Sequence, residues 1–99
     1  MPRSLPLPVK NTSPLASDLT ALGLLVRNRR HEQSMRIDNA AALLGVSTSV
    51  LSRLENGNPV GSDRLLRVLD GLGLSLLVVA RADSGKLLRA LGPSDEAAT

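Results

Sequence analysis

The fold is decided by the stretch NAAALLGVSTSVLSRLENG, residues 39–57, in which two short apolar-patterned segments meet at a glycine. Gly45 can take the left-handed conformation that ends a helix, and Ser47, two residues later, is a good N-cap for the next one. An Asn-Gly pair at the end of the stretch supplies a second stop. The pattern therefore predicts one helix over residues 37–44 and another over residues 48–55.

The two predicted helices each carry one apolar face. The residues expected to be buried are Ala40, Ala41, Leu44, Val50, Leu51 and Leu54. The small side chain of Ala41, close to the turn, lets the two helix axes cross closely, which is the helix-turn-helix arrangement.

The opposite face of the second helix carries Thr48, Ser49, Ser52 and Arg53. Short hydroxyl side chains allow a helix to lie deep in a DNA major groove, and an arginine there can reach a guanine edge or a phosphate. An ordinary solvated helix face is the alternative interpretation of the same residues.

Two further helices are predicted around this pair. Apolar residues at helical spacing indicate a helix over residues 15–31 that ends in a basic segment, which suits the helix dipole. Ser62 is a plausible N-cap for a helix from Asp63 to about Leu72, and the sequence GLG then ends it.

The segment LSLLVVA, Leu74 to Ala80, has leucine and valine on both faces and predicts a short buried strand. A strand needs a partner. Residues 82–85 could form a turn so that residues 86–91 pair back as a hairpin, or the strand could pair with the same strand of a second copy. We favour the second copy.

The chain is accordingly divided into four parts. Residues 1–14 contain four prolines and are expected to be an extended or disordered arm, either an inert tail or a basic arm that touches a phosphate backbone through Arg3 and Lys10. Residues 15–73 form the predicted DNA-binding domain, residues 74–91 the strand and dimerisation element, and residues 92–99 a mobile tail.

Composition narrows the function. The chain has 99 residues, no cysteine, no aromatic residue and one histidine, His31. Aromatic platforms for single-stranded bases are therefore missing, and a zinc centre or a histidine-based triad is not expected. No apolar run approaches the roughly 18 residues that span a bilayer, so we predict a cytoplasmic protein. We predict no metal site, no cofactor and no enzymatic activity.

Charge adds a weak indication. The formal net charge is +3, and the excess lies in residues 1–61, with seven Lys/Arg against four Asp/Glu, whereas residues 62–99 have five of each. Such an excess by itself only slightly favours nucleic acid as a partner.

Three segments carry a family resemblance: LLVRNRR, NAAALLGVSTSVLSRLENG and LLRVLDGLGLSLLVV. In this order they resemble the XRE/Cro-repressor type of helix-turn-helix regulator, and most closely the HipB-type antitoxins. The likeness covers roughly Leu19 to Val79. It implies an all-α, lambda-repressor-like fold of four to five helices with a short C-terminal strand, paired across a dimer.

The resemblance also assigns residue roles. It implies a structural ion pair between Arg30 and Glu55, which fits the need of a carboxylate at a helix C-terminus for a cation. DNA contacts are predicted from Ser47, Thr48, Ser49, Ser52, Arg53, Arg36, Asn56 and Asn58. A dimer interface is predicted from Leu72, Leu74, Leu76 and Val78.

The chain departs from the family pattern at two places. Arg36 and Ile37 stand where the family has a hydroxyl cap and a glutamine, so Arg36 is either a replacement phosphate contact or a solvent-exposed arginine. Ala40 stands where a leucine is typical, and Leu43 or Met35 is expected to fill the gap.

These observations predict a homodimeric, sequence-specific repressor that binds an inverted-repeat operator. The resemblance further implies a HipB-type antitoxin that regulates its own promoter and binds a HipA-type kinase toxin. A stand-alone regulator of the XRE family, or a helix-turn-helix interaction module without DNA binding, are the alternatives.

Overall fold

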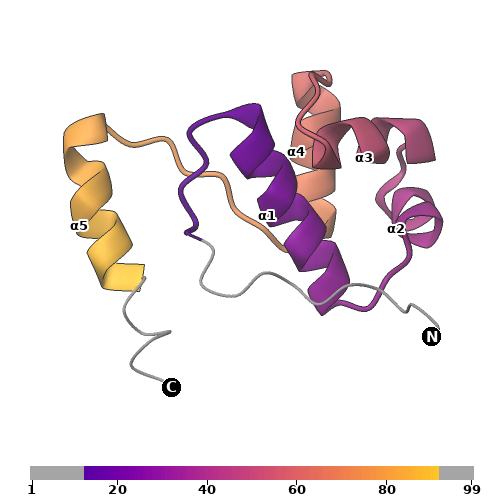
Figure 1. The fold of residues 1–99 in the computed structure, drawn as a ribbon, viewed down its shortest axis with the longest axis horizontal. Helices are drawn as coiled ribbons and strands as arrows, with labels where there is room; N and C mark the ends of the chain where they lie inside the picture. Colours follow the sequence, from indigo (N-terminus) through magenta and orange to yellow (C-terminus); the bar gives the residue numbers. More distant parts are fainter. Residues whose placement is uncertain (1–12, 92–99) are drawn as a thin grey trace.

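Five helices make up the part of the chain that the computed structural model describes, residues 13–91. They are α1 (Leu19–Glu32), α2 (Ile37–Leu44), α3 (Thr48–Glu55), α4 (Ser62–Gly71) and α5 (Arg81–Leu91). Helices α1 to α4 pack together and are called the body below, whereas residues 75–91, called the C-terminal extension, lead away from it to α5 (Figure 1). The predictions for residues 1–12 of the arm and for the tail, residues 92–99, lie outside the described residues.

Helix α1 begins later than the apolar spacing predicts. Asp18 is its N-cap, and the Oδ1 atom of that side chain accepts a hydrogen bond from the Ala21 amide at 2.8 Å. Leu15, the expected first residue, lies before this cap and is 48% exposed. A carboxylate that satisfies a free amide of the first turn fixes the start of a helix, and here it outweighs the apolar pattern.

The turn between α2 and α3 has the predicted chemistry. Gly45 adopts the left-handed conformation with φ 76°, and the Ser47 hydroxyl accepts a hydrogen bond from the Val50 amide at 3.0 Å. Arg67 of α4 donates a further hydrogen bond to the Gly45 carbonyl oxygen at 3.2 Å. The turn is therefore anchored from three elements.

The core lies between the four helices of the body. Its buried residues are Val26, Ala40, Ala41, Leu44, Leu51, Leu54, Val68, Leu69 and Leu72. Of the two residues expected to fill the space beside Ala40, Met35 packs against the core, whereas Leu43 is 71% exposed, so the prediction for Leu43 is wrong. Leu43 lies on the face of α2 that turns away from α3, because Ala40, Ala41 and Leu44 occupy the inner face.

Helices α1 and α3 approach closely at Gly23. A Cβ atom at this position would clash with the backbone carbonyl of Leu54 and lie 2.7 Å from the carbonyl oxygen of Glu55. Only a glycine fits here, because the neighbouring atoms are backbone atoms that cannot rotate away. This contact sets the distance between α1 and the carboxyl end of α3.

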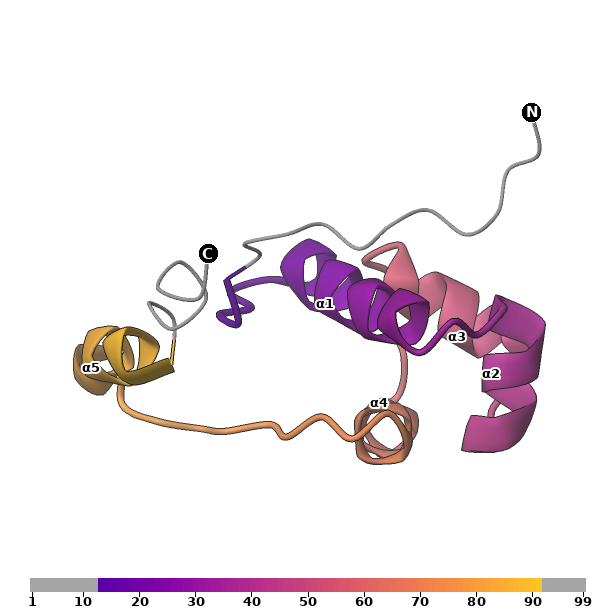
Figure 2. The ribbon, with the colours of Figure 1, turned by 90° about the horizontal axis from the view of Figure 1, so that it is seen from below.

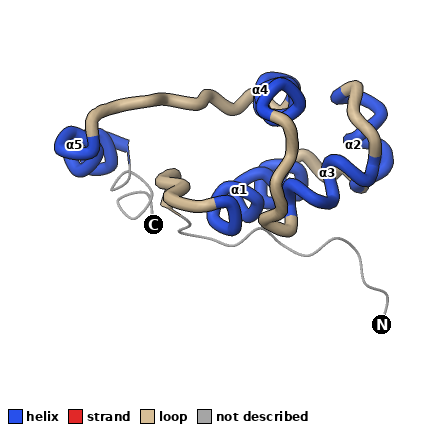
Figure 3. Tube along the Cα trace, turned by 90° about the horizontal axis from the view of Figure 1, so that it is seen from above, coloured by secondary structure: helices blue, strands red, loops and turns tan. Residues whose placement is uncertain are grey.

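The C-terminal extension differs from the prediction. Residues 74–80 form no strand in the described chain. Residues 75–80 connect the body to α5 as an extended segment that runs clear of the body (Figure 2). Figure 3 shows residues 13–91 as helices and loops. The hairpin alternative is wrong, because residues 81–91 form α5, whose first turn has Asp83 in a position that suits the helix dipole.

The predicted dimer residues fall into two groups. Leu72 is 1% exposed and belongs to the core of the single chain, so its assignment to an interface is wrong. Its carbonyl oxygen accepts a hydrogen bond from Arg29 Nε at 2.7 Å, which ties the end of α4 to α1. Leu74 packs partly against the core, whereas Leu76 and Val78 are 54% and 91% exposed.

Within residues 13–91, no helix is both long enough and apolar enough to cross a membrane.

Candidate nucleic-acid interface

Helix α3 has two chemically distinct faces. Leu51 and Leu54 point into the core, while Thr48 and Ser49 are exposed and Ser52 is half-buried. The outer face therefore consists of short hydroxyl side chains, which keep the helix backbone close to any surface that the face contacts. A major groove admits a helix of this kind.

Arg53 lies at the carboxyl end of this outer face. Its Nη2 atom donates a hydrogen bond to the carbonyl oxygen of Pro59 at 2.8 Å, in the loop between α3 and α4. The side chain is exposed, and this bond uses one of the five N–H groups of a guanidinium. Arg53 is thus held against the loop while it keeps donors for an acceptor in solution.

The two predicted asparagines have different surroundings. Asn56 caps α3, and its Nδ2 atom donates to the backbone oxygen of Ser52 at 2.9 Å and to the Ser52 hydroxyl at 3.4 Å. Its amide nitrogen is therefore engaged in the scaffold. Asn58 is exposed, and its backbone amide donates to the Arg53 carbonyl oxygen at 2.9 Å.

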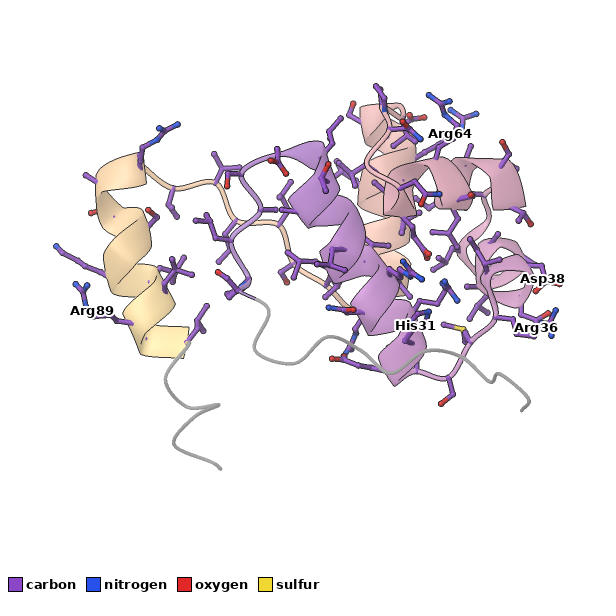
Figure 4. The ribbon with its side chains drawn as sticks, in the orientation of Figure 1. His31, Arg36, Asp38, Arg64 and Arg89 are labelled. Carbon is purple, nitrogen blue, oxygen red and sulfur yellow. The ribbon has the colours of Figure 1, made fainter. Side chains whose placement is uncertain are left out.

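The start of α2, a helix that packs against α3, carries Arg36. This residue is the N-cap of α2, and no side chain there bonds to the free amides of the first turn. Its Nε atom lies 3.6 Å from Asp38 Oδ1, and both side chains are more than half exposed. Figure 4 shows both residues at the periphery of the molecule. Arg36 thus has an acidic partner, which neither sequence interpretation included.

The start of α4 has a similar arrangement that sequence reasoning missed. Gly61 is the N-cap, and the expected cap, Ser62, is instead the first residue of the helix. Arg64 Nη1 lies 3.7 Å from Asp63 Oδ2, again between exposed side chains. Arg64 lies near the upper end of α4, on the side of α3 (Figure 4). An arginine in the first turn of the helix after α3 was the available sequence signal.

Arg30 and Glu55 are joined behind the outer face. Arg30 Nε lies 2.6 Å from Glu55 Oε2 and Nη2 lies 2.8 Å from Oε1, and the two side chains are only 7% and 5% exposed. Arg30 Nη1 also donates to the Met35 carbonyl oxygen at 2.9 Å. The pair joins the end of α1, the end of α3 and the α1–α2 turn, and neither side chain is accessible to a ligand.

His31 adjoins this pair and is 8% exposed. Burial lowers the pKa of its imidazole below the ordinary value of 6.5, and the positive charges of Arg30 and Arg27 lower it further, while Glu55 opposes them. The imidazole is therefore held in its neutral form near neutral pH.

Comparison with known proteins gives two findings. A protein-family profile described as a helix-turn-helix domain matches residues 21–82. A Sinorhizobium fredii protein named as the uncharacterized HTH-type transcriptional regulator y4mF is 36% identical over 66 residues, which cover 66% of this chain and 87% of the relative.

Proposed function

Because the chain belongs to the helix-turn-helix domain family, we propose that it is a sequence-specific DNA-binding transcriptional repressor that reads the major groove with α3. One observation carries this proposal: the hydroxyl side chains and Arg53 lie on the outer face of α3. The leucines of α3 are buried in the core, and Glu55 pairs with Arg30. The name of the Sinorhizobium fredii relative agrees with a regulatory role.

The proposed contacts follow from this geometry. Thr48, Ser49 and Ser52 would contact base edges or the adjacent backbone, and Arg53 would reach a guanine edge or a phosphate. Ser47 would add a contact through its hydroxyl hydrogen, since its oxygen already accepts from the Val50 amide. Arg36 and Asn58 would donate to phosphates at the edges of the interface. The carboxamide nitrogen of Asn56 already donates to Ser52, so its carbonyl oxygen would accept from a donor on a base edge.

Selection of duplexes from a random-sequence library by the purified full chain tests the proposal. We expect enrichment of one sequence, and a loss of about 1 to 3 kcal/mol of binding free energy when Arg53 is changed to alanine. Arg89→Ala is the matched control, because Arg89 lies on α5, away from α3 (Figure 4). Binding to the enriched duplex no tighter than to random duplex at physiological salt would contradict the proposal and leave a protein-interaction module.

We also propose that the protein is a homodimer that joins through the extended segment before α5. Leu76, Leu77 and Val78 are 54%, 61% and 91% exposed, and this segment has no strand partner within residues 13–91. An unpaired extended segment with apolar side chains favours pairing with an identical segment. A two-fold dimer would bind two inverted half-sites whose centres are about 34 Å apart.

The finer proposal is a HipB-type antitoxin that represses its own promoter and binds a HipA-type kinase toxin. Its support is the resemblance of residues 19–79 to that branch of the family. Co-expression with a kinase-like neighbouring gene product, followed by size-exclusion chromatography, tests it. A stable complex is expected, and separate elution of the two proteins would leave a stand-alone regulator of the XRE family.

A further inference from the structure

The two helices on either side of α3 begin with the same kind of pair. Arg36 and Asp38 lie at the start of α2, Asp63 and Arg64 lie at the start of α4, and the separations are 3.6 and 3.7 Å. Each of the four side chains is more than half exposed. Arg36 and Arg64, the arginines in these two helix starts, therefore each have an aspartate next to them, whereas Arg53 bonds to the Pro59 carbonyl oxygen.

We propose that Asp38 and Asp63 are specificity determinants: each occupies an arginine that would otherwise bind phosphates of any DNA, and releases it only to a phosphate that α3 docking brings close. The inference rests on the proposed function, because it concerns the same DNA-binding surface. It assigns a role in DNA recognition to Asp38 and Asp63, which do not contact DNA themselves.

Release of the arginines is physically easy. The nitrogen–oxygen separations exceed those of good charge-assisted hydrogen bonds, which are about 2.7 to 2.9 Å. Exposed ion pairs of this kind contribute only about 0.2 to 1 kcal/mol. A phosphate oxygen at close range offers the same type of acceptor as the carboxylate, so it can replace the aspartate at little cost.

The aspartates act most strongly on loose complexes. Phosphate contacts carry no sequence information, so a free arginine strengthens binding to every duplex. In a non-specific complex the phosphates are not held at fixed positions. The aspartate always lies near its arginine because both belong to the same chain, so the ion pair persists. In a specific complex α3 fixes the duplex, and the exchange becomes favourable.

The two aspartates lower the net positive charge of the surface near α3. Arg53 lies on the outer face of α3, Arg36 and Arg64 lie at the starts of α2 and α4, and the acids next to the last two arginines are Asp38 and Asp63. Glu55 does not contribute there, because its side chain is buried against Arg30. The two aspartates therefore offset two of these three positive charges, which would attract DNA without regard to sequence.

The test uses the full chain with both acids changed, Asp38→Asn and Asp63→Asn. Asparagine keeps the shape and the Oδ1 acceptor, which in Asp38 binds the Asn39 amide at 2.9 Å. The probes are a mixed-sequence duplex of about 30 base pairs and the duplex enriched by the unchanged protein. Affinity is measured by fluorescence anisotropy across salt concentrations from about 50 to 200 mM.

We expect the double variant to bind the mixed-sequence duplex about three- to tenfold more tightly at about 50 mM salt. The slope of log affinity against log salt should steepen by about two, one for each released arginine. Affinity for the enriched duplex should rise less, so the ratio of specific to non-specific affinity should fall.

Two controls separate release of the arginines from a general gain of charge. Asp70→Asn removes the same charge at the other end of α4 and should leave the ratio unchanged. In an Arg36→Gln background, Asp38→Asn should lose most of its effect. Equal effects of Asp70→Asn, or an undiminished effect without Arg36, would overturn the inference.

The outcomes also separate the inference from the proposed function. If the unchanged protein selects a duplex but the double variant binds mixed DNA no more tightly, the inference is wrong and the proposed function stands. If the unchanged protein binds no DNA at all, both are wrong.

Discussion

The body and the C-terminal extension both contain many apolar residues, but only the body buries them. In the body, nine hydrophobic residues are buried against one another within one chain. In the extension, residues 75–91, no side chain is buried, and Val78 is 91% exposed. An apolar pattern therefore indicates which residues tend to be buried, but it does not distinguish burial within one chain from burial against a partner. Substitutions in the body should change its free energy of unfolding, whereas substitutions in the extension should change self-association.

The largest effect on the body should come from Glu55→Ala. It leaves the buried guanidinium of Arg30 without its carboxylate, and breaking such a pair costs about 3 to 5 kcal/mol. The measurement is the free energy of unfolding from urea denaturation. Glu32→Ala, which removes the exposed partner of Arg29 at 3.4 Å, should cost about 1 kcal/mol or less. Equal costs for the two variants would show that burial does not distinguish these pairs.

A smaller loss is expected from Gly23→Ala. The added methyl group meets the carbonyl oxygens of Leu54 and Glu55, and overpacking of this kind costs about 1 to 3 kcal/mol. Gly85→Ala in α5 is the matched change in the extension, where the new Cβ would lie 3.7 Å from a side-chain atom of Arg89. It should leave urea unfolding of the body unchanged. A stabilised Gly23→Ala variant would mean that α1 and α3 move apart without cost.

The body should also lose stability in mild acid through His31. Its lowered pKa means that the unfolded chain takes up the proton at a higher pH than the folded chain. The contribution is fully present above pH 6.5 and is lost as the pH falls through 6.5 towards the folded pKa. His31→Gln should flatten this part of the stability–pH curve, whatever its effect at pH 8. An unchanged slope would assign the acid sensitivity to other groups.

The smallest effect on folding should come from Val78→Ser. An exposed side chain adds little to the stability of the body, so the free energy of unfolding at low protein concentration should stay within about 0.5 kcal/mol. Self-association should weaken, as measured by sedimentation equilibrium. If the unchanged protein is monomeric, or if the variant associates as strongly as the unchanged protein, the proposed dimer is wrong.

The same contrast explains what sequence reasoning could predict. The turn between α2 and α3 depends on local chemistry, the left-handed Gly45 and the Ser47 cap, and such chemistry is readable from neighbouring letters. Asp18 was missed because the apolar spacing of α1 continues on both sides of it. Helix α5 was missed because the segment ADSG is typical of turns as well as of a first helical turn.

The candidate site shows a similar division. The pairing of Arg30 with Glu55 was implied by the family resemblance, and the need of a carboxylate at a helix C-terminus for a cation supports it. The bond from Arg53 to Pro59 could not be predicted, because it depends on how the loop after α3 returns towards that helix. The pairs at the starts of α2 and α4 join residues one or two positions apart, so the sequence contained them, but they were overlooked. Leu72 was assigned to a partner because periodicity alone does not separate a core residue from an interface residue.

The division of α3 into two faces has a consequence for the history of such a protein. Fold-bearing residues, Leu51, Leu54 and Glu55, occupy one side, and none of Thr48, Ser49 and Ser52 is fully buried. Mutations on the outer side can therefore accumulate without loss of the native state. A duplicated copy of the gene could acquire a new target through changes in three short side chains, while the residues that stabilise the fold stay the same.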